Sequence, residues 1–443
     1  MGRNRPHIET FGCRLNIWES EVMREQAEQA GLTDVVIVNT CAVTSEAERQ
    51  ARQSIRRIRR EQPDTKIVLT GCAVQIDPDS WAAMDEADHV IGNHDKLSAA
   101  SWQALAQAEL APVQVSDIMD IRDTASHMLD CFDDHTRAFL QVQQGCDHRC
   151  SFCIIPYGRG PSRSVPADQV ITSARHLVSS GVKEIVLTGV DMTSWGHDLD
   201  GQPKLGQLVL SLLEEVPELL RLRLSSVDPA EPDSYLMEAF SSHSRLMPHL
   251  HLSVQHGDDL ILKRMKRRHL ARDVIRFCEE ARRRRSDIVF GADMICGFPT
   301  ETDDAHHASC ELVRNAGLTH LHIFGFSPRE GTAAARMPQL EKSVIKSRVA
   351  ELRSVAQSQL EAHLATRVGG TDMLLVESGK TGHLSGFEKA VLADGAQAAA
   401  GDVIAVSIEG HDGERLAVSP LACQPQIEAG TAIKTSQNRQ GQK

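Results

Sequence analysis

The sequence predicts an α/β protein of three parts: an open parallel-sheet domain, a partial (β/α)6 barrel and a small C-terminal β-barrel. The first two parts are predicted because strand and helix signals alternate through the first ~125 residues and again through a longer second region. The last part is predicted because short β-rich segments separated by glycines follow from about Val368. We expect domains at residues 4–125, 132–366 and 367–423, and a polar, disordered tail at 424–443.

The N-terminal region has the rhythm of a sheet wound with helices. Strand signals lie at residues 7–10, 34–39 and 66–70, and helix signals lie at 17–30 and 44–60. Because parallel strands need crossover connections, this βαβαβ order predicts an open parallel sheet with helices on both faces. A polar, aspartate-rich stretch from about Val113 to Thr136 is expected to be a linker.

The second region predicts a barrel. Its strands are expected at 138–143, 183–188, 220–226, 249–254, 288–295 and 319–324, with helices such as 167–180 and 271–285 between them. Six units of this length favour an open or partial barrel over a closed one of eight strands. A long helix at 341–365 is expected to end the domain, and the strands of the last part are expected at 372–377, 384–387, 390–392, 402–408 and 415–418.

Length and composition exclude several classes of protein. The chain has 443 residues, of which 41% are hydrophobic, and this is enough for packed cores. We find no apolar run that could cross a membrane and no signal-peptide pattern, so we expect a cytoplasmic protein with no membrane partner. The net charge of −12 does not indicate nucleic-acid binding. Basic residues nevertheless gather at 49–60, 263–268 and 282–285; such runs are more often solvated helix faces, but they can also hold phosphate.

The sharpest chemical signal is a loop with the spacing C-x3-C-x2-C, formed by Cys146, Cys150 and Cys153 directly after the first barrel strand. Structural zinc sites normally have four ligands. Three thiolates in so short a loop instead suit a [4Fe–4S] cluster with one open iron, which the amino and carboxylate groups of S-adenosylmethionine can chelate. The alternatives are three unrelated thiols or a zinc site with a distant fourth ligand.

Loops at the same end of the barrel offer a cradle for this cofactor. Gly189 and Asp191 follow the second strand, and Gly297 follows the fifth. A glycine allows close approach of the backbone to a ligand, although a glycine after a strand is usually just a turn. We expect these three residues to contact S-adenosylmethionine.

A second set of cysteines is spread over the N-terminal region. Cys13, Cys41 and Cys72 each come just after a predicted strand. Because ligands of open parallel sheets bind at the carboxyl ends of the strands, the three thiols are expected to meet and to hold a second iron–sulfur cluster. The alternative is that they are small buried hydrophobes. The remaining cysteines, which show no ligand spacing, are expected to be packing residues: Cys131, Cys278, Cys296, Cys310 and Cys423.

At this point the chain resembles the radical S-adenosylmethionine methylthiotransferases over about residues 6 to 422. The segments that carry the resemblance are Thr10–Glu21, Val38–Thr44, Leu69–Gln75, Gln144–Gly160, His249–His269 and Cys296–Thr302. The resemblance implies an auxiliary [4Fe–4S] cluster on Cys13, Cys41 and Cys72, a radical cluster on Cys146, Cys150 and Cys153, and an RNA-binding TRAM domain at the C-terminus. It also implies two molecules of S-adenosylmethionine, one for the methyl group and one for the radical.

Two segments, Lys263–His269 and Ser327–Pro338, look most like the branch of this family that modifies C2 of N6-threonylcarbamoyladenosine next to the anticodon of tRNA. One departure is Arg14, where that branch often has lysine, but the charge is kept. The threonyl carboxylate needs a cation, and Arg159, Arg329 and Arg336 are the candidates, although solvated or structural roles are the more common ones for such arginines.

Several alternatives remain open at this stage. The substrate can be N6-isopentenyladenosine in tRNA or a ribosomal-protein side chain, and a non-enzyme alternative is an iron–sulfur protein that binds RNA or senses redox state. Besides tRNA, the chemistry needs an electron donor of flavodoxin or ferredoxin type and a source of sulfur that the sequence does not identify.

Overall fold

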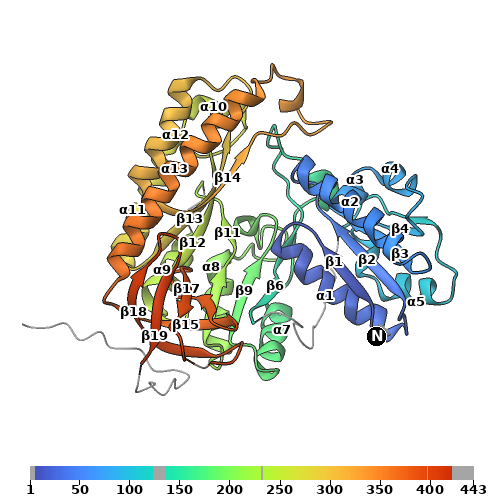
Figure 1. The fold of residues 1–443 in the computed structure, drawn as a ribbon, viewed down its shortest axis with the longest axis horizontal. Helices are drawn as coiled ribbons and strands as arrows, with labels where there is room; N and C mark the ends of the chain where they lie inside the picture. The colour runs from blue at the N-terminus through green and yellow to red at the C-terminus, as the bar shows by residue number, and fades with distance from the viewer. Residues whose placement is uncertain (1–4, 123–135, 231–232, 397, 422–443) are drawn as a thin grey trace, which may run out of the picture.

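Three parts follow one another along the chain in the computed structural model, which describes residues 5–122, 136–230, 233–396 and 398–421 (Figure 1). A sheet domain lies beside a central barrel, and helix α13 (Lys342–Arg367) leads into a small C-terminal β-barrel. The predicted fold class is therefore confirmed. The predicted tail at 424–443, together with Cys131 and Cys423, lies outside the described residues.

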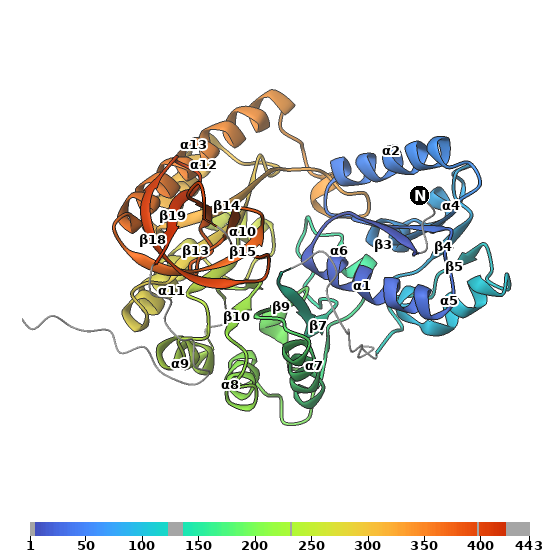
Figure 2. The same ribbon diagram turned by 60° about the horizontal axis from the view of Figure 1, so that its bottom comes forward.

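The N-terminal sheet has five parallel strands in the order of the sequence, and helices cover both of its faces, as predicted (Figure 2). Met23 of α1 and Trp102 of α5 share one core with Ile37, whereas Ile55 of α2 shares the opposite core with Val38. The strands are β1 (His7–Thr10), β2 (Val35–Thr40), β3 (Lys66–Gly71), β4 (His89–Ile91) and β5 (Val113–Gln114). The helices are α1 (Arg14–Gln29), α2 (Ser45–Glu61), α3 (Cys72–Ile76), α4 (Pro78–Ala82) and α5 (Ala99–Ala106), with a short turn at Asp95–Leu97.

The predicted start of the linker, at about Val113, is wrong. Val113–Gln114 forms β5 and pairs with β4. The next residues still belong to the sheet domain, because Ser116 donates its backbone N–H to Asp95 at 2.8 Å and Ile118 is buried. A two-residue edge strand is too short to leave a period-2 pattern, so its polar composition concealed it.

The central domain is the predicted partial barrel, and all six of its predicted strands are confirmed. Strands β10-β9-β6 form one sheet and β11-β12-β13-β14 form the other, joined through a bridge between Leu222 and Leu246. The strands are β6 (Ala138–Gln141), β9 (Glu184–Thr188), β10 (Arg221–Leu224), β11 (Ser226–Val227), β12 (His249–Gln255), β13 (Val289–Cys296) and β14 (Leu318–Gly325), with a small hairpin of β7 (Gln143–Gln144) and β8 (Arg163–Ser164). The helices are α6 (Ile155–Arg159), α7 (Ala167–Ser179), α8 (Leu205–Glu215), α9 (Ser234–Ser242), α10 (Asp259–Arg264), α11 (Ala271–Arg284), α12 (Asp303–Ala316) and α13, with short turns at Met192–Ser194 and Ala334–Arg336.

The C-terminal β-barrel is closed in the order β15-β16-β17-β19-β18. Its strands are β15 (Thr371–Ser378), β16 (Thr381–His383), β17 (Lys389–Leu392), β18 (Val403–His411) and β19 (Leu416–Pro420). The predicted strand at 384–387 is wrong, because those residues form the turn between β16 and β17. Leu384 and Glu388 are joined by a backbone hydrogen bond of 3.0 Å, and Phe387 has φ of +73°. The apolar residues at the two ends of this turn have the pattern of a strand, but in the structure they contact the central barrel.

That contact anchors the C-terminal barrel on the central one. Arg221 and Arg223 of β10 donate to the carbonyls of Leu384 and Ser385, and the guanidinium of Arg223 lies 5.0 Å from the centre of the Phe387 ring. Glu184 of β9 pairs with both arginines, at 2.7 and 3.0 Å. Burial raises the pKa of Glu184, but Arg223 and Arg221 outweigh burial and hold it at about 2. The two barrels are therefore joined by buried charges.

In the described part of the chain, no helix combines the length and the apolar character that a membrane crossing requires.

Candidate functional site

The loop of Cys146, Cys150 and Cys153 connects β7 to α6 and is held from two sides. Ser151 donates its backbone N–H to the carbonyl of Met265 at 3.0 Å, and Ala334 donates to the carbonyl of Ser151 at 2.8 Å. Gly145, at φ of +72°, begins the loop where a Cβ would lie 1.9 Å from the Pro161 oxygen, so no side chain fits there. The three thiols are therefore presented by a fixed backbone.

These thiols lie among charges. The sulfur of Cys146 is 3.9 Å from Asp191 Oδ2, and that of Cys150 is 3.8 Å from Arg267 Nη1. Burial raises the pKa of Cys146, as do Asp191 and the two neighbouring thiols; burial also raises the pKa of Cys153 to about 11. Thiols that are costly to ionise side by side are stabilised as thiolates by a bound metal cluster. The site fits the predicted iron–sulfur cluster.

The second set of thiols also comes together. Cys13 and Cys41 follow β1 and β2, and Cys72 follows β3, all at the carboxyl edge of the sheet. A Cβ on Gly12 would lie 2.8 Å from Cys41 Sγ, which is why glycine stands before Cys13. Burial raises the pKa of Cys13 and that of Cys41, the latter to about 12, and the charge of Cys72 raises both further. This donor set of three soft ligands likewise fits an iron–sulfur cluster.

Arg159 joins the two domains behind this second set, and its predicted role with substrate is therefore corrected. Its side chain is only 2% exposed. Nε donates to Cys72 Sγ at 3.0 Å, and the guanidinium grips the carboxylate of Glu19 in α1, with Nη2 at 3.0 Å from Oε2. Lys96, fully buried, binds the same carboxylate at 2.7 Å. Arg159 thus has partners throughout and cannot reach a substrate carboxylate.

Burial raises the pKa of Glu19, but Arg159 and Lys96 outweigh it and leave the pKa below its ordinary value. Burial alone disfavours the charge of Arg159, yet Cys72 and Glu19 reverse this and raise its pKa. The Glu19–Lys96–Arg159 network, which no sequence pattern indicated, is thus a buried and fully charged support of the Cys72 sulfur.

The predicted cradle residues have partners of their own. At Gly189 a Cβ would lie 3.0 Å from the carbonyl oxygen of Gln143, a tight contact that favours glycine. Gly297, at φ of +77°, faces Ile345 of α13 at 2.5 Å from the Cβ position. Asp191 holds His148 of the cysteine loop at 3.0 Å and Ser194 at 2.7 Å. Packing accounts for both glycines, and a contact with S-adenosylmethionine stays a prediction for all three.

The other two candidate arginines differ in exposure and in their partners. Arg329 is 12% exposed and pairs with Glu48 and Ser45 of α2, so it ties the segment after β14 to the N-terminal domain. Arg336 is exposed at the end of the Ala334–Arg336 turn. Cys278, Cys296 and Cys310 are buried in the core of the central barrel, as expected.

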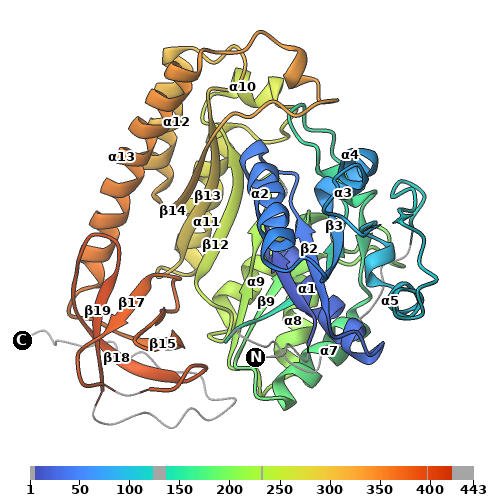
Figure 3. The same ribbon diagram turned by 45° about the vertical axis from the view of Figure 1, so that its right-hand side comes forward.

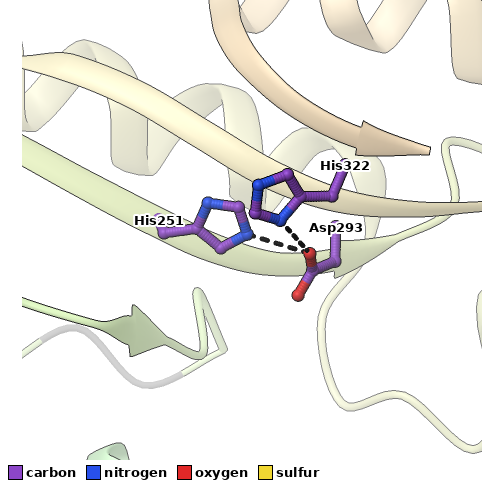
Figure 4. Close-up of side chains that lie close together, drawn as sticks. All are labelled: His251, Asp293 and His322. Atoms are coloured by element: carbon purple, nitrogen blue, oxygen red, sulfur yellow. Dashed lines mark hydrogen bonds and ion pairs between the residues drawn. The ribbon is translucent and has the colours of Figure 1, made fainter. Parts of the chain in front are cut away.

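A polar cluster that the sequence reading missed lies on three neighbouring strands. His251 Nε2 of β12 and His322 Nδ1 of β14 both face Oδ1 of Asp293 in β13, at 3.0 and 3.1 Å (Figure 4). Burial raises the pKa of Asp293, but the two imidazoles more than offset this and lower it. The signal was present in the alternation of HLHL at 249–252 and THLH at 319–322, which puts polar side chains on one face of each strand.

The N-terminal and central domains each match a known protein family. Residues 140–313 match the radical SAM superfamily, and residues 5–92 match a family described as uncharacterized protein family UPF0004. The chain is 48% identical over 383 residues to the threonylcarbamoyladenosine tRNA methylthiotransferase MtaB of Rickettsia prowazekii, with 86% of this chain and 90% of the relative covered. It is 33% identical over 422 residues to the tRNA-2-methylthio-N(6)-dimethylallyladenosine synthase of Paracoccus denitrificans, with 90% and 93% covered.

Among solved structures, the chain is similar to the radical S-adenosylmethionine methyltransferase TsrM of Kitasatospora setae, solved with cobalamin and a [4Fe–4S] cluster bound. The TM-score is 0.56 at 15% identity, and 76% of this chain and 77% of that chain are covered. At this identity the likeness concerns the fold alone.

Proposed function

Because the chain belongs to the radical SAM tRNA methylthiotransferase family, we propose that it attaches a methylthio group to C2 of N6-threonylcarbamoyladenosine next to the anticodon of tRNA. The observation that carries this proposal is the presence of two separate three-thiol sites, one in each domain, in a chain whose 48% identical relative is named for that nucleoside. Two relatives named for the dimethylallyl nucleoside are 33% and 34% identical, the same as two further MtaB relatives, so the choice of nucleoside rests on the 48% identical relative.

In this proposal Cys146, Cys150 and Cys153 hold a [4Fe–4S] cluster that takes S-adenosylmethionine, and Cys13, Cys41 and Cys72 hold an auxiliary [4Fe–4S] cluster. When bound, these groups supply one-electron chemistry that can activate the unreactive C2–H bond and a place for the incoming sulfur. The electron donor is expected to be a flavodoxin- or ferredoxin-type protein. The polypeptide itself holds the two sets of thiolates and admits the substrate base to them.

The residues around the thiols do this holding. Arg267 donates to the carbonyl of Ser253 at 2.6 Å and pairs with Asp228 at 2.9 Å, so its position next to Cys150 is fixed. Asn93 donates to Cys72 Sγ at 3.6 Å and joins Arg159 as a second donor to that sulfur. Donors placed at a thiolate stabilise its negative charge and exclude water from it.

The tRNA partner needs a basic surface near the loop cluster. Part of the basic composition is neutralised by ion pairs within the chain: Arg59 pairs with Asp88, and Arg283 and Arg284 pair with Glu280 on the surface of α11. Lys263 and Lys266, by contrast, are exposed on the turn whose carbonyls bind Ser151 of the cysteine loop. We infer that this turn and the C-terminal barrel contact tRNA phosphates. We also propose that the chain is divided into domains at 4–125, 132–366 and 367–423.

The decisive experiment compares two anticodon stem-loops that differ only in the purine modification. Reconstituted, reduced protein is incubated with S-adenosylmethionine and a sulfide source, and nucleosides are analysed by mass spectrometry. We expect the methylthio product from the threonylcarbamoyl stem-loop, and none from the dimethylallyl one or from the Cys150→Ala variant. Turnover of only the dimethylallyl stem-loop would refute the nucleoside assignment and leave the family's reaction in place.

A further inference from the structure

We propose that Arg14 and the His251–Asp293–His322 cluster form the pocket that binds the anionic N6 substituent of the substrate purine, with Arg14 pairing with its carboxylate. This inference rests on the proposed function and adds to it the residues that select the substrate. It replaces Arg159, which is fully engaged with Glu19 and Cys72.

The cluster faces the inside of the partial barrel. Leu250 and Leu252 of β12, and Ala292 and Met294 of β13, belong to the core beneath the outer helices. Side chains alternate along a strand, so His251 and Asp293 point to the opposite, inner face. His322 does the same on β14, and its side chain is 61% exposed. The cluster is therefore buried at His251 and open at His322.

The cluster is also linked to both thiol sites through neighbouring residues. On one side, Arg14 begins α1 directly after Cys13, and its guanidinium lies 5.6 Å from the centre of the Phe387 ring, which stacks on His249, two residues before His251 in β12. On the other side, two residues beyond His251, the carbonyl of Ser253 accepts from Arg267, which also donates to Cys150. A base that is to meet both thiol sites has to enter the space onto which this cluster opens.

Arg14 is a cation that lacks an anionic partner. Arg137, Arg221 and Arg223 nearby have ion pairs with Glu184 or Glu377, whereas within the described ranges no ion pair or hydrogen bond is recorded for the Arg14 side chain. The guanidinium of Arg14 shares the Phe387 ring with those of Arg137 and Arg223, which lie 5.6, 5.2 and 5.0 Å from the ring centre respectively, so like charges surround it. A cation destabilised in this way gains much from an arriving carboxylate, which arginine binds through two parallel hydrogen bonds.

The cluster suits the polar remainder of the substituent. Asp293 uses Oδ1 for both imidazoles, and for Oδ2 the described structure records no contact, so Oδ2 can accept from an N–H or O–H group. His322 is held through Nδ1, which leaves Nε2 available to a ligand. In adenine, N1 is flanked by C2 and by C6, the atom that bears N6. A base that presents C2 to the thiol sites therefore carries its N6 substituent into the same space.

The test uses anticodon stem-loops with the free threonyl acid, with its neutral methyl ester, or with unmodified adenosine, and measures binding by titration. We expect the wild-type protein to bind the acid more tightly than the ester, and Arg14→Gln to lose that preference, a change of roughly tenfold to a hundredfold for a charged hydrogen bond. Arg14→Lys should retain most of it. Arg24→Gln, on the same helix but paired with Glu21, is the matched control and should bind like wild type.

Each further outcome is decisive. If the iron content of Arg14→Gln equals that of wild type, the variant has kept the adjacent Cys13 site. If its iron content is lower, His322→Gln is tested instead. That variant should bind both the acid and the ester stem-loops more weakly relative to the unmodified one. An unchanged acid preference in Arg14→Gln, or none in wild type, would overturn the pocket while the proposed function stands if the acid stem-loop is still methylthiolated. A stoichiometric non-iron divalent metal that is lost in His322→Gln would also overturn it, because the cluster would then be a metal site.

Discussion

The two thiol sites are built in opposite ways. Cys146, Cys150 and Cys153 lie within eight residues of one loop, are partly exposed, and have the partly exposed His148 beside them. Cys13, Cys41 and Cys72 come from three strand ends spread over sixty residues, and the charges behind them, Glu19, Lys96 and Arg159, are almost fully buried.

The difference shows what holds the ligands of each site in position. The ligands of the loop site are neighbours in the chain, and its backbone is held by hydrogen bonds to Met265 and Ala334. The strand-end site exists only when the sheet has formed and when the barrel supplies Arg159 as a donor to Cys72. A change at the domain interface should therefore disturb the strand-end site first.

The largest effect should come from removing one ligand from each site. Cys150→Ala should abolish cleavage of S-adenosylmethionine, because the open iron at the loop site is lost. Cys41→Ala should spare that cleavage and reduce methylthio transfer to background. Chromatography of deoxyadenosine measures the cleavage, and chromatography of modified nucleosides measures the transfer. The variant Cys278→Ala, at a buried core cysteine, is the control. Full product formation by Cys41→Ala would show that the strand-end site has only a structural role.

Iron content should separate the two sites next. Two cubane clusters give about eight irons and eight sulfides per wild-type chain after anaerobic reconstitution. The combined Cys13, Cys41 and Cys72 alanine variant should keep about four, because the loop site assembles independently. Colorimetric iron and sulfide assays decide this, and about four irons in intact wild-type protein would remove the strand-end cluster.

Glu19→Gln should destabilise the protein by about 3–5 kcal/mol, because it leaves two buried cations without their anion. The sign of its pH dependence follows from the lowered pKa of Glu19 in the folded state. Its stabilisation is present above the unfolded pKa of about 4.3 and is lost as pH falls through the folded value. Urea unfolding at several pH values should show the gap between variant and wild type closing in acid; a gap that is constant with pH would contradict this.

Asp191→Asn at the loop site should have the smallest effect, about 1 kcal/mol or less, because the amide can still bond to Ser194 and His148 is partly solvated. The same urea titration measures it. A loss as large as that of Glu19→Gln would mean that the loop site depends on buried charge as much as the strand-end site does.

Local pattern was enough for much of the molecule. Strands such as VVIVNT at Val35–Thr40 are uniformly apolar because both faces of a parallel sheet are covered, and the cysteine loop is visible because its ligands are neighbours in sequence. The meeting of Cys13, Cys41 and Cys72 was also predictable, because the carboxyl ends of parallel strands share one edge.

By itself, then, the sequence determined the order of strands and helices, the two barrels and the six thiols, since these depend on period, spacing and strand ends. Only the tertiary structure decided which arginines meet which anions. Arg159 and Arg14 are alike as sequence signals, yet one is buried against Glu19 and the other lacks an ion pair in the described structure. The turn at 384–387 likewise has the pattern of a strand, because it is apolar. It is apolar because it packs against Arg223 of another domain. Ionic and interdomain contacts have no period along the chain, and so they appear only when the chain has folded.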